Sequence, residues 1–280
     1  MELSGKTLAA GVLDRVRERI LRLGEKKIIP ELAIVTVGGE EAWFSYVSQK
    51  LKTAERLGIK TQRHHIDATD ENSLFKLCSQ LNNDKAVHGV IVQRPLPAVI
   101  NRKKIVDAIE KNKDIDGFRE DSPYAVPMVL AIEHFIREAY GVITASDLEK
   151  VLINQSICVV GKGETAGKPA TKYLDSKRAA YTIIDTKTKN PCQELKKADL
   201  VITGVGKSDV IKPECLKPGV VLIGIGIHAE NGKLVGDYDV AKIKGIAKAW
   251  TPTPGGVGPL NLAYLFQNLV DATEKLTSSK

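Results

Sequence analysis

The sequence has 280 residues, a formal net charge of +7 and 43% hydrophobic residues, values typical of a soluble globular protein with room for two domains. No stretch approaches the roughly 18 uninterrupted apolar residues of a membrane span, and the amphipathic N-terminus lacks the apolar core of a secretory signal. The basic residues are scattered, which argues against a nucleic-acid-binding surface. Four widely spaced cysteines form no CxxC pair. We therefore expect neither a zinc site nor a disulfide framework, and a reducing cytoplasm fits this usage.

The chain up to residue 118 alternates helical and strand patterns. We expect helices at 7–24, 41–57, 71–82 and 101–111, and buried or half-buried strands at 32–37, 60–66 and 87–92. This repeating order predicts a parallel α/β domain. An irregular region begins with KDIDGF at 113–118, and a helix at 128–140 is expected to link this domain to the next.

The rest of the chain predicts a second α/β domain. We expect short helices at 146–153 and 192–197, a last helix at 260–276, and strands at 157–160, 181–184, 200–203, 220–225 and 246–249. The segment TPTPGGVGP at 251–259 is expected to be irregular because it is rich in proline and glycine. Because prolines also stiffen it, we favour a ligand site over a flexible linker.

The stretch from Ser156 to Thr188 has the order of a dinucleotide-binding unit. An apolar strand is followed by Gly161, Gly163 and Gly167, then by a helix-length segment, a second strand and Asp185. Glycines allow the backbone to approach a pyrophosphate, and the helix N-terminus offers free N–H groups. A carboxylate at the second strand's end can hold a ribose hydroxyl.

Polar residues in the first half are candidates for chemistry. Tyr46 and Lys50 are four residues apart on one helix and so share a face, and a buried lysine can take part in proton transfer. Gln93 ends a buried strand, where a side-chain amide can orient a ligand. Asp114 and Asp116 lie in a turn with Gly117, where aspartates commonly form turns, and the glycine spacing and the missing distal glutamate argue against a calcium loop.

Five motifs occur along the chain in the order YVSQK, VQRPLP, KDIDGF, VVGKGETAGKP and TPTPGGVGP. With these motifs in this order, the whole chain resembles the bifunctional methylenetetrahydrofolate dehydrogenase/methenyltetrahydrofolate cyclohydrolase family. This resemblance implies two α/β domains with folate in a cleft between them and the nicotinamide cofactor on the second. The expected boundaries are 1–140, completed by 260–280, for the folate domain and 141–259 for the Rossmann-type domain.

The resemblance also implies roles for individual residues. Lys50 matches the catalytic lysine, Gln93 the glutamine that supports it, Asp116 the aspartate that holds the pterin ring, and Tyr46 the tyrosine that orients the folate. The remaining substrate-binding positions are Val47, Ser48, Gln49, Val92, Arg94, Pro254, Gly255, Gly256, Val257, Gly258, Pro259, Leu260 and Asn261. The cofactor-binding positions are Gly161, Lys162, Gly163, Gly167, Asp185, Thr186 and Ile227. No metal is implied.

The sequence does not decide between NADP and NAD as the cofactor. The family default is NADP, but the family's Arg-Ser after the first glycine is Lys162-Gly163 here. Lys162 and Lys187 favour a 2′-phosphate, whereas Asp185 repels one and favours NAD. Two further departures lie beside the substrate: the segment 118–132 lacks the family's PCTPxG, and Asn261 replaces a threonine.

The implied activity is oxidation of 5,10-methylenetetrahydrofolate followed by hydrolysis to 10-formyltetrahydrofolate, within one-carbon metabolism and purine biosynthesis. The alternatives are a monofunctional NAD-dependent dehydrogenase and a non-catalytic folate- or nucleotide-binding relative. A hydroxy-acid dehydrogenase is less favoured because none of the five histidines has a convincing site. The family is commonly dimeric, so we expect a cytoplasmic homodimer whose ligands are small molecules.

Overall fold

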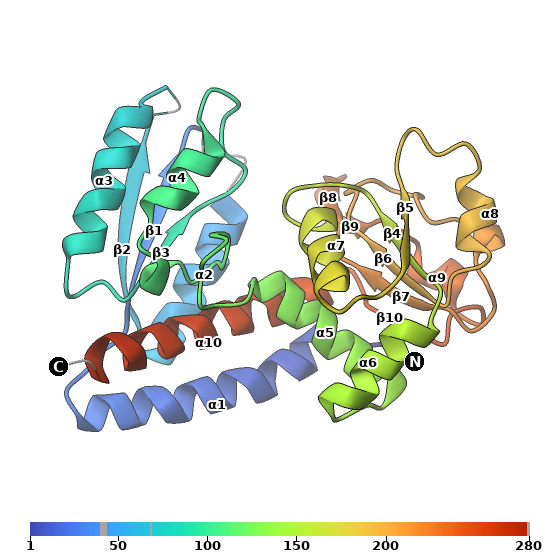
Figure 1. Cartoon of the computed structure of the whole chain (residues 1–280), viewed down its shortest axis with the longest axis horizontal. Coiled ribbons are helices and arrows are strands. Elements are labelled where there is room, and N and C mark those ends of the chain that lie inside the picture. Colours follow the sequence, from blue (N-terminus) through green and yellow to red (C-terminus); the bar gives the residue numbers. More distant parts are fainter. Residues whose placement is uncertain (40–43, 68, 279–280) are drawn as a thin grey trace. The chain divides into compact units, whose positions relative to one another are not determined.

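The computed structural model describes residues 1–39, 44–67 and 69–278 and divides the chain into two compact units (Figure 1). The first unit comprises Gly11–Pro127 with Leu262–Lys280. The second unit comprises Met1–Ala10 with Met128–Asn261. Helices α1 (Gly5–Glu25) and α10 (Val257–Ser278) contribute residues to both. No described helix is long and apolar enough to cross a membrane.

The first unit is built on a parallel sheet in the order β2-β1-β3. Its strands are β1 (Glu31–Val37), β2 (Lys60–Ile66) and β3 (Gly89–Val92). Each is followed by a helix, in turn α2 (Phe44–Leu57), α3 (Glu71–Asn83) and α4 (Arg102–Ala108). This confirms the predicted βα repeat. Residues 41–43, with which the second expected helix begins, lie outside the described part of the chain.

Both faces of this sheet are covered by helices. Side chains alternate along β1, so Leu32 and Ile34 point to one face while Ala33, Val35 and Val37 point to the other. The first face packs against α2, α1 and α10 through residues such as Val47, Val16 and Phe266. The second packs against α3 and α4 through Leu74, Cys78 and Ile105. This two-sided burial explains why β1 and β3 are almost continuously apolar, whereas the edge strand β2 (KTQRHHI) is polar and exposed or partly buried.

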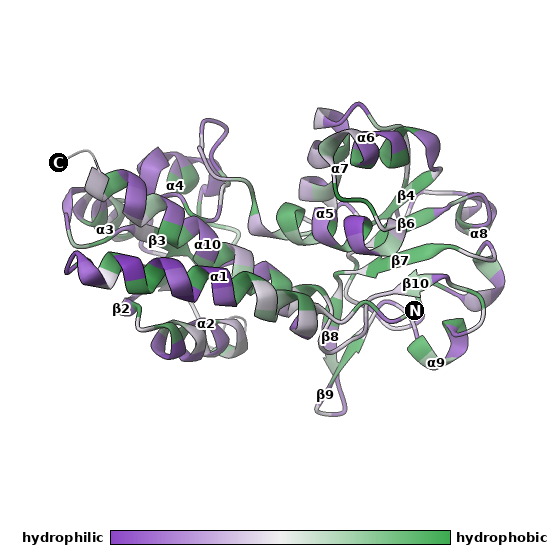
Figure 2. Cartoon of the chain, turned by 90° about the horizontal axis from the view of Figure 1, so that it is seen from below, coloured by the Kyte–Doolittle hydropathy of each residue, from purple (hydrophilic) through white to green (hydrophobic). Residues whose placement is uncertain are grey.

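The second unit contains a five-stranded parallel sheet in the order β10-β7-β6-β4-β5. The strands are β4 (Ile157–Val160), β5 (Tyr181–Ile184), β6 (Leu200–Thr203), β7 (Val221–Gly224) and β10 (Ala249–Trp250). Figure 2 shows β4, β6 and β7 as mostly apolar segments. The helices of this unit include α5 (Pro127–Tyr140), α6 (Ala145–Asn154), α7 (Gly167–Ser176) and α8 (Pro191–Leu195). Chain order reverses at β4, between β5 and β6, and such a switch point is where open α/β sheets bind ligands.

Several short elements were absent from the sequence-based prediction. They are η2 (Lys111–Lys113), η3 (Pro213–Cys215), α9 (Val240–Ile243) and the antiparallel hairpin of β8 (Ile227–Glu230) and β9 (Lys233–Gly236). The sequence Asn231-Gly232 could have predicted the hairpin, because it favours a two-residue hairpin turn. In the structure both residues have the positive φ angles that such a turn needs, 51° and 74°.

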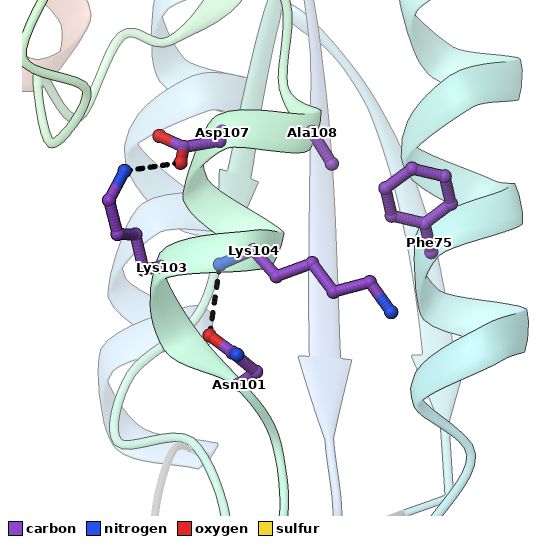
Figure 3. Close-up of a pocket in the computed structure, with 6 residues that line it drawn as sticks. All are labelled: Phe75, Asn101, Lys103, Lys104, Asp107 and Ala108. Atoms are coloured by element: carbon purple, nitrogen blue, oxygen red, sulfur yellow. Dashed lines mark hydrogen bonds and ion pairs between the residues drawn. The ribbon is translucent and has the colours of Figure 1, made fainter.

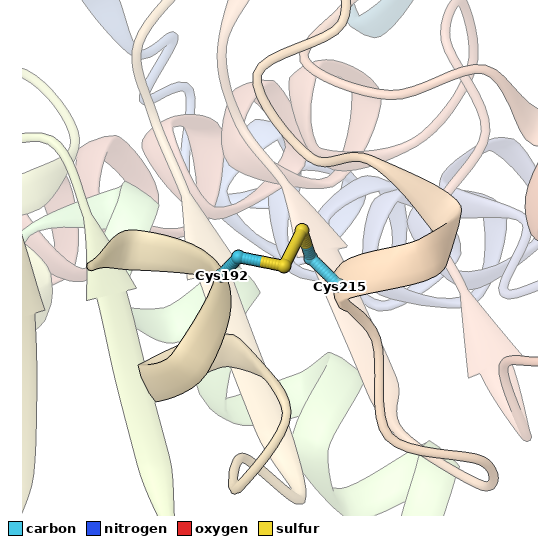
Figure 4. The surroundings of a disulfide bond; sticks show 2 residues. All are labelled: Cys192 and Cys215. Carbon is cyan, nitrogen blue, oxygen red and sulfur yellow. A yellow bond between two sulfur atoms is a disulfide. The ribbon is translucent and has the colours of Figure 1, made fainter.

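The expectation of no disulfide was wrong. Cys192 at the start of α8 and Cys215 in η3 form a disulfide, with Cα atoms 4.7 Å apart (Figure 4). The 23-residue separation gave no signal because the pairing depends on tertiary packing of two elements that had not both been predicted. Cys78 and Cys158 are free and buried.

The expectation that 251–259 is wholly irregular was also wrong at its end. Helix α10 begins at Val257, so Gly258 and Pro259 lie in its first turn. Proline is tolerated there because the first N–H groups of a helix have no intrahelical acceptor. Sequence composition therefore placed the helix start three residues too late.

Candidate active site

Lys50 and Gln93 meet in the first unit. Lys50 lies on α2, and its Nζ donates a 2.7 Å hydrogen bond to Oε1 of Gln93, which follows β3. The Gln93 amide is fixed in turn, because its Nε2 donates to the carbonyl of Arg94 and its backbone N–H donates to Val35 of β1. The glutamine is 7% exposed. Its oxygen is therefore a preset acceptor for the lysine ammonium.

Asp116 completes an electrostatic cluster with Lys50. Burial lowers the pKa of Lys50, and the Asp116 carboxylate partly opposes this shift. Burial raises the pKa of Asp116, and the positive charges of Lys50 and Arg94 oppose that shift. Burial is the largest cause of the pKa shift of both groups, so the neutral form of each is more favoured here than in water. Each of the two charges therefore favours the charged form of the other against the effect of burial.

The loop that carries Asp116 is held by residues distant in sequence. Lys113 is 4% exposed, and its Nζ donates to the carbonyls of Leu81, Asn82 and Asp84 at the end of α3. Asn268 on α10 donates to the carbonyl of Ile115 at 2.8 Å.

Gly117 closes the turn after Asp116. Its φ is +68°, and a Cβ there would lie 2.6 Å from the Tyr124 carbonyl oxygen, so a larger residue would displace the turn. Asp114 stabilises the same turn by accepting from the Arg119 N–H at 2.9 Å. Burial raises the pKa of Asp114 to about 6. Asp114 therefore stabilises the turn, whereas Asp116 interacts electrostatically with Lys50.

The other predicted substrate residues in this unit differ in exposure. Tyr46 lies one turn before Lys50 and is 47% exposed, so its ring is available to a ligand. The side chain of Val47 is buried in the core, and Val92 belongs to the core on the opposite face of the sheet. Ser48 is partly buried and Gln49 is exposed.

Arg94 is fixed beside this cluster by an aromatic ring. Its guanidinium lies 3.9 Å from the centroid of the Phe118 ring, and the Arg94-Pro95 peptide bond is cis. Arg94, Asp116 and Phe118 also line a small cavity of about 10 Å³. This is close to the minimum space for one water molecule, so the cavity is an internal feature of the site and does not hold a substrate.

The predicted Pro-Gly segment lies in the second unit, except for its continuation along α10. Gly255 accepts a hydrogen bond from the Lys6 N–H, and a Cβ on Gly5 would lie 1.7 Å from the Gly256 carbonyl oxygen. The start of α1 therefore packs directly on the two glycines, a contact that the sequence did not reveal. The substrate-lining role of residues 254–261 stays a prediction.

The glycine loop of the second unit fits a dinucleotide. Gly161 has a φ of +96°, and a Cβ on Gly167 would lie 2.0 Å from the Gly161 carbonyl oxygen. Both positions therefore require glycine, whereas Gly163 has no positive φ and no close neighbour. Helix α7 begins at Gly167, and its N-cap residue Ala166 makes no side-chain hydrogen bond. In this first turn the Lys168 N–H donates to the Gly163 carbonyl at 2.9 Å and Pro169 has no N–H, so the backbone donor left to face a phosphate is the Gly167 N–H.

Lys162 and Asp185 form an ion pair beside this loop. Lys162 Nζ lies 2.6 Å from Asp185 Oδ2, and Asp185 also accepts from the Lys187 N–H at 2.9 Å. These contacts hold the pKa of Asp185 below its usual value, with the Lys162 hydrogen bond contributing most. Thr186 is exposed beside the pair, and Ile227 is 36% exposed at the start of β8. From the sequence alone, Lys162 was expected to favour a 2′-phosphate and Asp185 to repel one. In the structure these two side chains form one ion pair.

A second hollow in the first unit lies on the surface between α3 and α4 (Figure 3). It has a volume of about 470 Å³ and is lined by Phe75, Asn101, Lys103, Lys104, Asp107 and Ala108. Its charged residues are already paired: Lys104 with Glu71 at 2.9 Å, and Lys103 with Asp107. None of the predicted site residues lines it. Across the described residues, no group of three His, Cys, Asp or Glu is placed to hold a metal ion.

Two models of the tetrahydrofolate dehydrogenase/cyclohydrolase family match the sequence. The catalytic domain matches residues 3–116, and the NAD(P)-binding domain matches residues 139–277. Among curated proteins, "Bifunctional protein FolD" of an Exiguobacterium species is 32% identical over 98% of both chains. The protein of the same name from Staphylococcus aureus is 36% identical over 95% of this chain and 94% of its own.

Solved structures resemble the chain over nearly its full length. The bifunctional FolD enzyme of Campylobacter jejuni has a TM-score of 0.88 at 30% identity and covers 98% of this chain and 99% of its own. A Trypanosoma brucei FolD, crystallised with NADP and an inhibitor, has a TM-score of 0.87 at 23% identity, covers 98% of this chain and 97% of its own, and supports the fold alone.

Proposed function

Because this chain belongs to the tetrahydrofolate dehydrogenase/cyclohydrolase family, we infer that Lys50 is the centre of its two reactions and that NADP is its hydride acceptor. The family activity is oxidation of 5,10-methylenetetrahydrofolate and hydrolysis of the methenyl product in one-carbon folate metabolism. The observation that carries the assignment of Lys50 is its 2.7 Å hydrogen bond to Gln93 beside Asp116.

The side chains around Lys50 suit proton transfer during hydrolysis. Burial lowers the pKa of Lys50, which increases the share of neutral amine able to take a proton from the attacking water. Gln93 holds the lysine's nitrogen in place, and Asp116 supplies a carboxylate for the cationic substrate and its ring donors. Exposed Tyr46 offers a ring one helical turn away. NADP, when bound on the second unit, accepts the hydride of the first reaction.

Two features support NADP over NAD. Lys162 neutralises the Asp185 carboxylate at 2.6 Å, and Lys187 adds a second basic residue two positions after Asp185 in the sequence. A 2′-phosphate beside Asp185 would therefore approach a neutralised carboxylate and the Lys162 ammonium, not a free negative charge. The alternative of a monofunctional NAD-dependent dehydrogenase was motivated by Asp185, and the ion pair of Asp185 with Lys162 argues against it.

We also infer a homodimer, as the family resemblance implies, and a cytoplasmic location, which was expected from the cysteine usage. The Cys192–Cys215 disulfide is the observation against that location, because disulfides are rare in a reducing cytosol. Size-exclusion chromatography with light scattering tests the dimer, and cell fractionation of the source organism tests the location.

The deciding experiment for the function measures both reactions in wild type and in Lys50→Met. Absorbance at 340 nm with 5,10-methylenetetrahydrofolate follows hydride transfer with NADP or NAD, and loss of methenyl absorbance follows hydrolysis. We expect wild type to catalyse both and Lys50→Met to lose hydrolysis while keeping a wild-type melting temperature. Near-normal hydrolysis by the variant would remove Lys50 from the mechanism, and turnover by wild type excludes a non-catalytic relative.

A further inference from the structure

A buried carboxylate outside the predicted site organises the carboxyl edge of the second unit's sheet. Asp237 follows β9 and is fully buried, at 0% exposure. Its Oδ2 accepts from Thr203 Oγ1 at 2.7 Å and from the Val205 N–H at 3.0 Å. Its Oδ1 accepts from the N–H groups of Gly206 at 2.7 Å and Lys207 at 3.1 Å. All four donors lie in the 203–207 loop, which consists of Thr203, the last residue of β6, and the four residues after it.

The loop 203–207 lies against the glycine loop. A Cβ on Gly161 would lie 3.0 Å from the Gly204 carbonyl oxygen and 3.2 Å from a methyl carbon of Val205. A Cβ on Gly204 would lie 2.4 Å from Cβ of Ala166, the residue before α7. The position of the loop therefore sets how closely the end of β6 approaches the glycine loop.

Asp237 also contacts the segment after β7. A Cβ on Gly226 would lie 2.3 Å from one carboxylate oxygen of Asp237 and 2.4 Å from the other. The carbonyl of Thr203 accepts from the N–H groups of Ile225 and Gly226, which joins the two segments. One carboxylate thus fixes the spacing between the ends of β6 and β7.

Two apolar side chains stand exposed on the segments that Asp237 fixes. Val205 is 39% exposed and Ile227 is 36% exposed, and the backbone of Ile227 lies against Gly206. A dinucleotide bound at this switch point would place its pyrophosphate at the glycine loop and its adenosine ribose toward β5 and Asp185. Its other half would then extend over the ends of β6 and β7, where Val205 and Ile227 offer an apolar surface to the flat nicotinamide ring.

We propose that Asp237 is a positioning residue for the dehydrogenase reaction, which presets the 203–207 loop and Ile227 to receive the nicotinamide half of the cofactor. This proposal rests on the proposed use of NADP by the second unit. The loop's successive N–H groups form a concave set of donors that attracts an anion. Because the protein's own carboxylate fills this set, the loop is ordered before the cofactor arrives and binding does not have to order it.

The test replaces Asp237 with asparagine, which keeps the shape but removes the charge and turns an NH₂ group toward two of the four donors. The matched control is Asp239→Asn, an equal charge change two residues away at an exposed helix cap, where asparagine also caps well. Calorimetric titration with NADP gives Kd without turnover. We expect Asp237→Asn to weaken NADP binding about tenfold or more and Asp239→Asn to leave it within about twofold.

Methenyl hydrolysis, measured without NADP, separates positioning from general damage. Asp237→Asn should raise Kd and KM for NADP while hydrolysis by the first unit stays near wild type. Equal loss of both activities together with a lower melting temperature, or an unchanged Kd in the folded variant, would overturn the proposal.

A milder variant covers the case in which Asp237→Asn does not fold. Thr203→Val removes a single donor to Asp237 and keeps the side-chain volume. It should raise Kd for NADP about threefold at an unchanged melting temperature, and a wild-type Kd would overturn the proposal. If wild type itself binds no NADP, the proposed function fails, which is a different outcome from wild-type binding with unaffected variants.

Discussion

Lys50 Nζ and Gln93 Oε1 are 2.7 Å apart, and the glutamine is anchored on both sides by backbone contacts. The lysine's long side chain has many rotamers in water, so a fixed acceptor restricts its ammonium group to one location. The pair joins a helix to the end of a strand, 43 residues apart in sequence. This relationship makes Gln93 the best place to test whether the position of Lys50, apart from its chemistry, limits hydrolysis.

Gln93→Met removes both side-chain hydrogen bonds and keeps a similar volume. We expect kcat for methenyl hydrolysis to fall about 100-fold, because a misplaced proton-transfer group loses its alignment with the attacking water. KM for the folate should change little. Gln80→Met, on the exposed face of α3, is the control. A variant of Gln93 with wild-type kcat would contradict the positioning role.

Asp116→Asn tests the coupling between the two charges. The carboxylate raises the pKa of Lys50 against the lowering effect of burial, so its removal should lower the pKa of Lys50 further. Hydrolysis that depends on neutral Lys50 rises with pH through that pKa, and the rising limb should therefore move to lower pH in the variant.

The measurement is the midpoint of the kcat/KM profile for methenyl hydrolysis, because the midpoint is independent of the loss of substrate affinity that the variant also suffers. Asp107→Asn, on the exposed side of α4, is a control for an equal change of charge. A midpoint that stays in place or moves to higher pH would show that Asp116 does not act on Lys50 electrostatically.

The sequence predicted the order of strands and helices well because these elements have strong local patterns. The apolar runs of β1 and β4, and the glycines after β4, are local signals, and the structure confirms two parallel sheets. The residues that position the site were missed because their partners are distant. Asn268 reaches Ile115 across 153 residues, and Asp237 reaches Thr203 across 34. A polar side chain gives no periodic signal, so only the fold reveals such contacts.

The Lys162–Asp185 pair predicts how cofactor preference can be changed. Asp185→Ser removes the carboxylate and frees Lys162 for a 2′-phosphate, so the ratio of kcat/KM for NADP to that for NAD should rise about tenfold. Lys162→Met leaves Asp185 without its main partner, and the ratio should fall by a similar factor. Both effects should weaken as salt is added, because Lys162 is largely exposed.

Lys172→Met, on the exposed side of α7, controls for loss of one positive charge near the site. If both site variants keep the wild-type ratio, the pair does not determine the preference. If wild type prefers NAD, the inference of NADP as hydride acceptor is wrong.

The Cys192–Cys215 disulfide predicts a stability that depends on the redox state of the solution. Closing a loop of 23 residues restricts the unfolded chain, which contributes about 3 kcal/mol to the free energy of unfolding in the loop-entropy description. Cys192→Ser should lower that free energy by about this amount in denaturant titrations without reductant. Wild type treated with dithiothreitol is the matched control and should unfold like the variant. Thiol titration of denatured wild type should find two reactive thiols, from Cys78 and Cys158, and four would show that the bond is not formed.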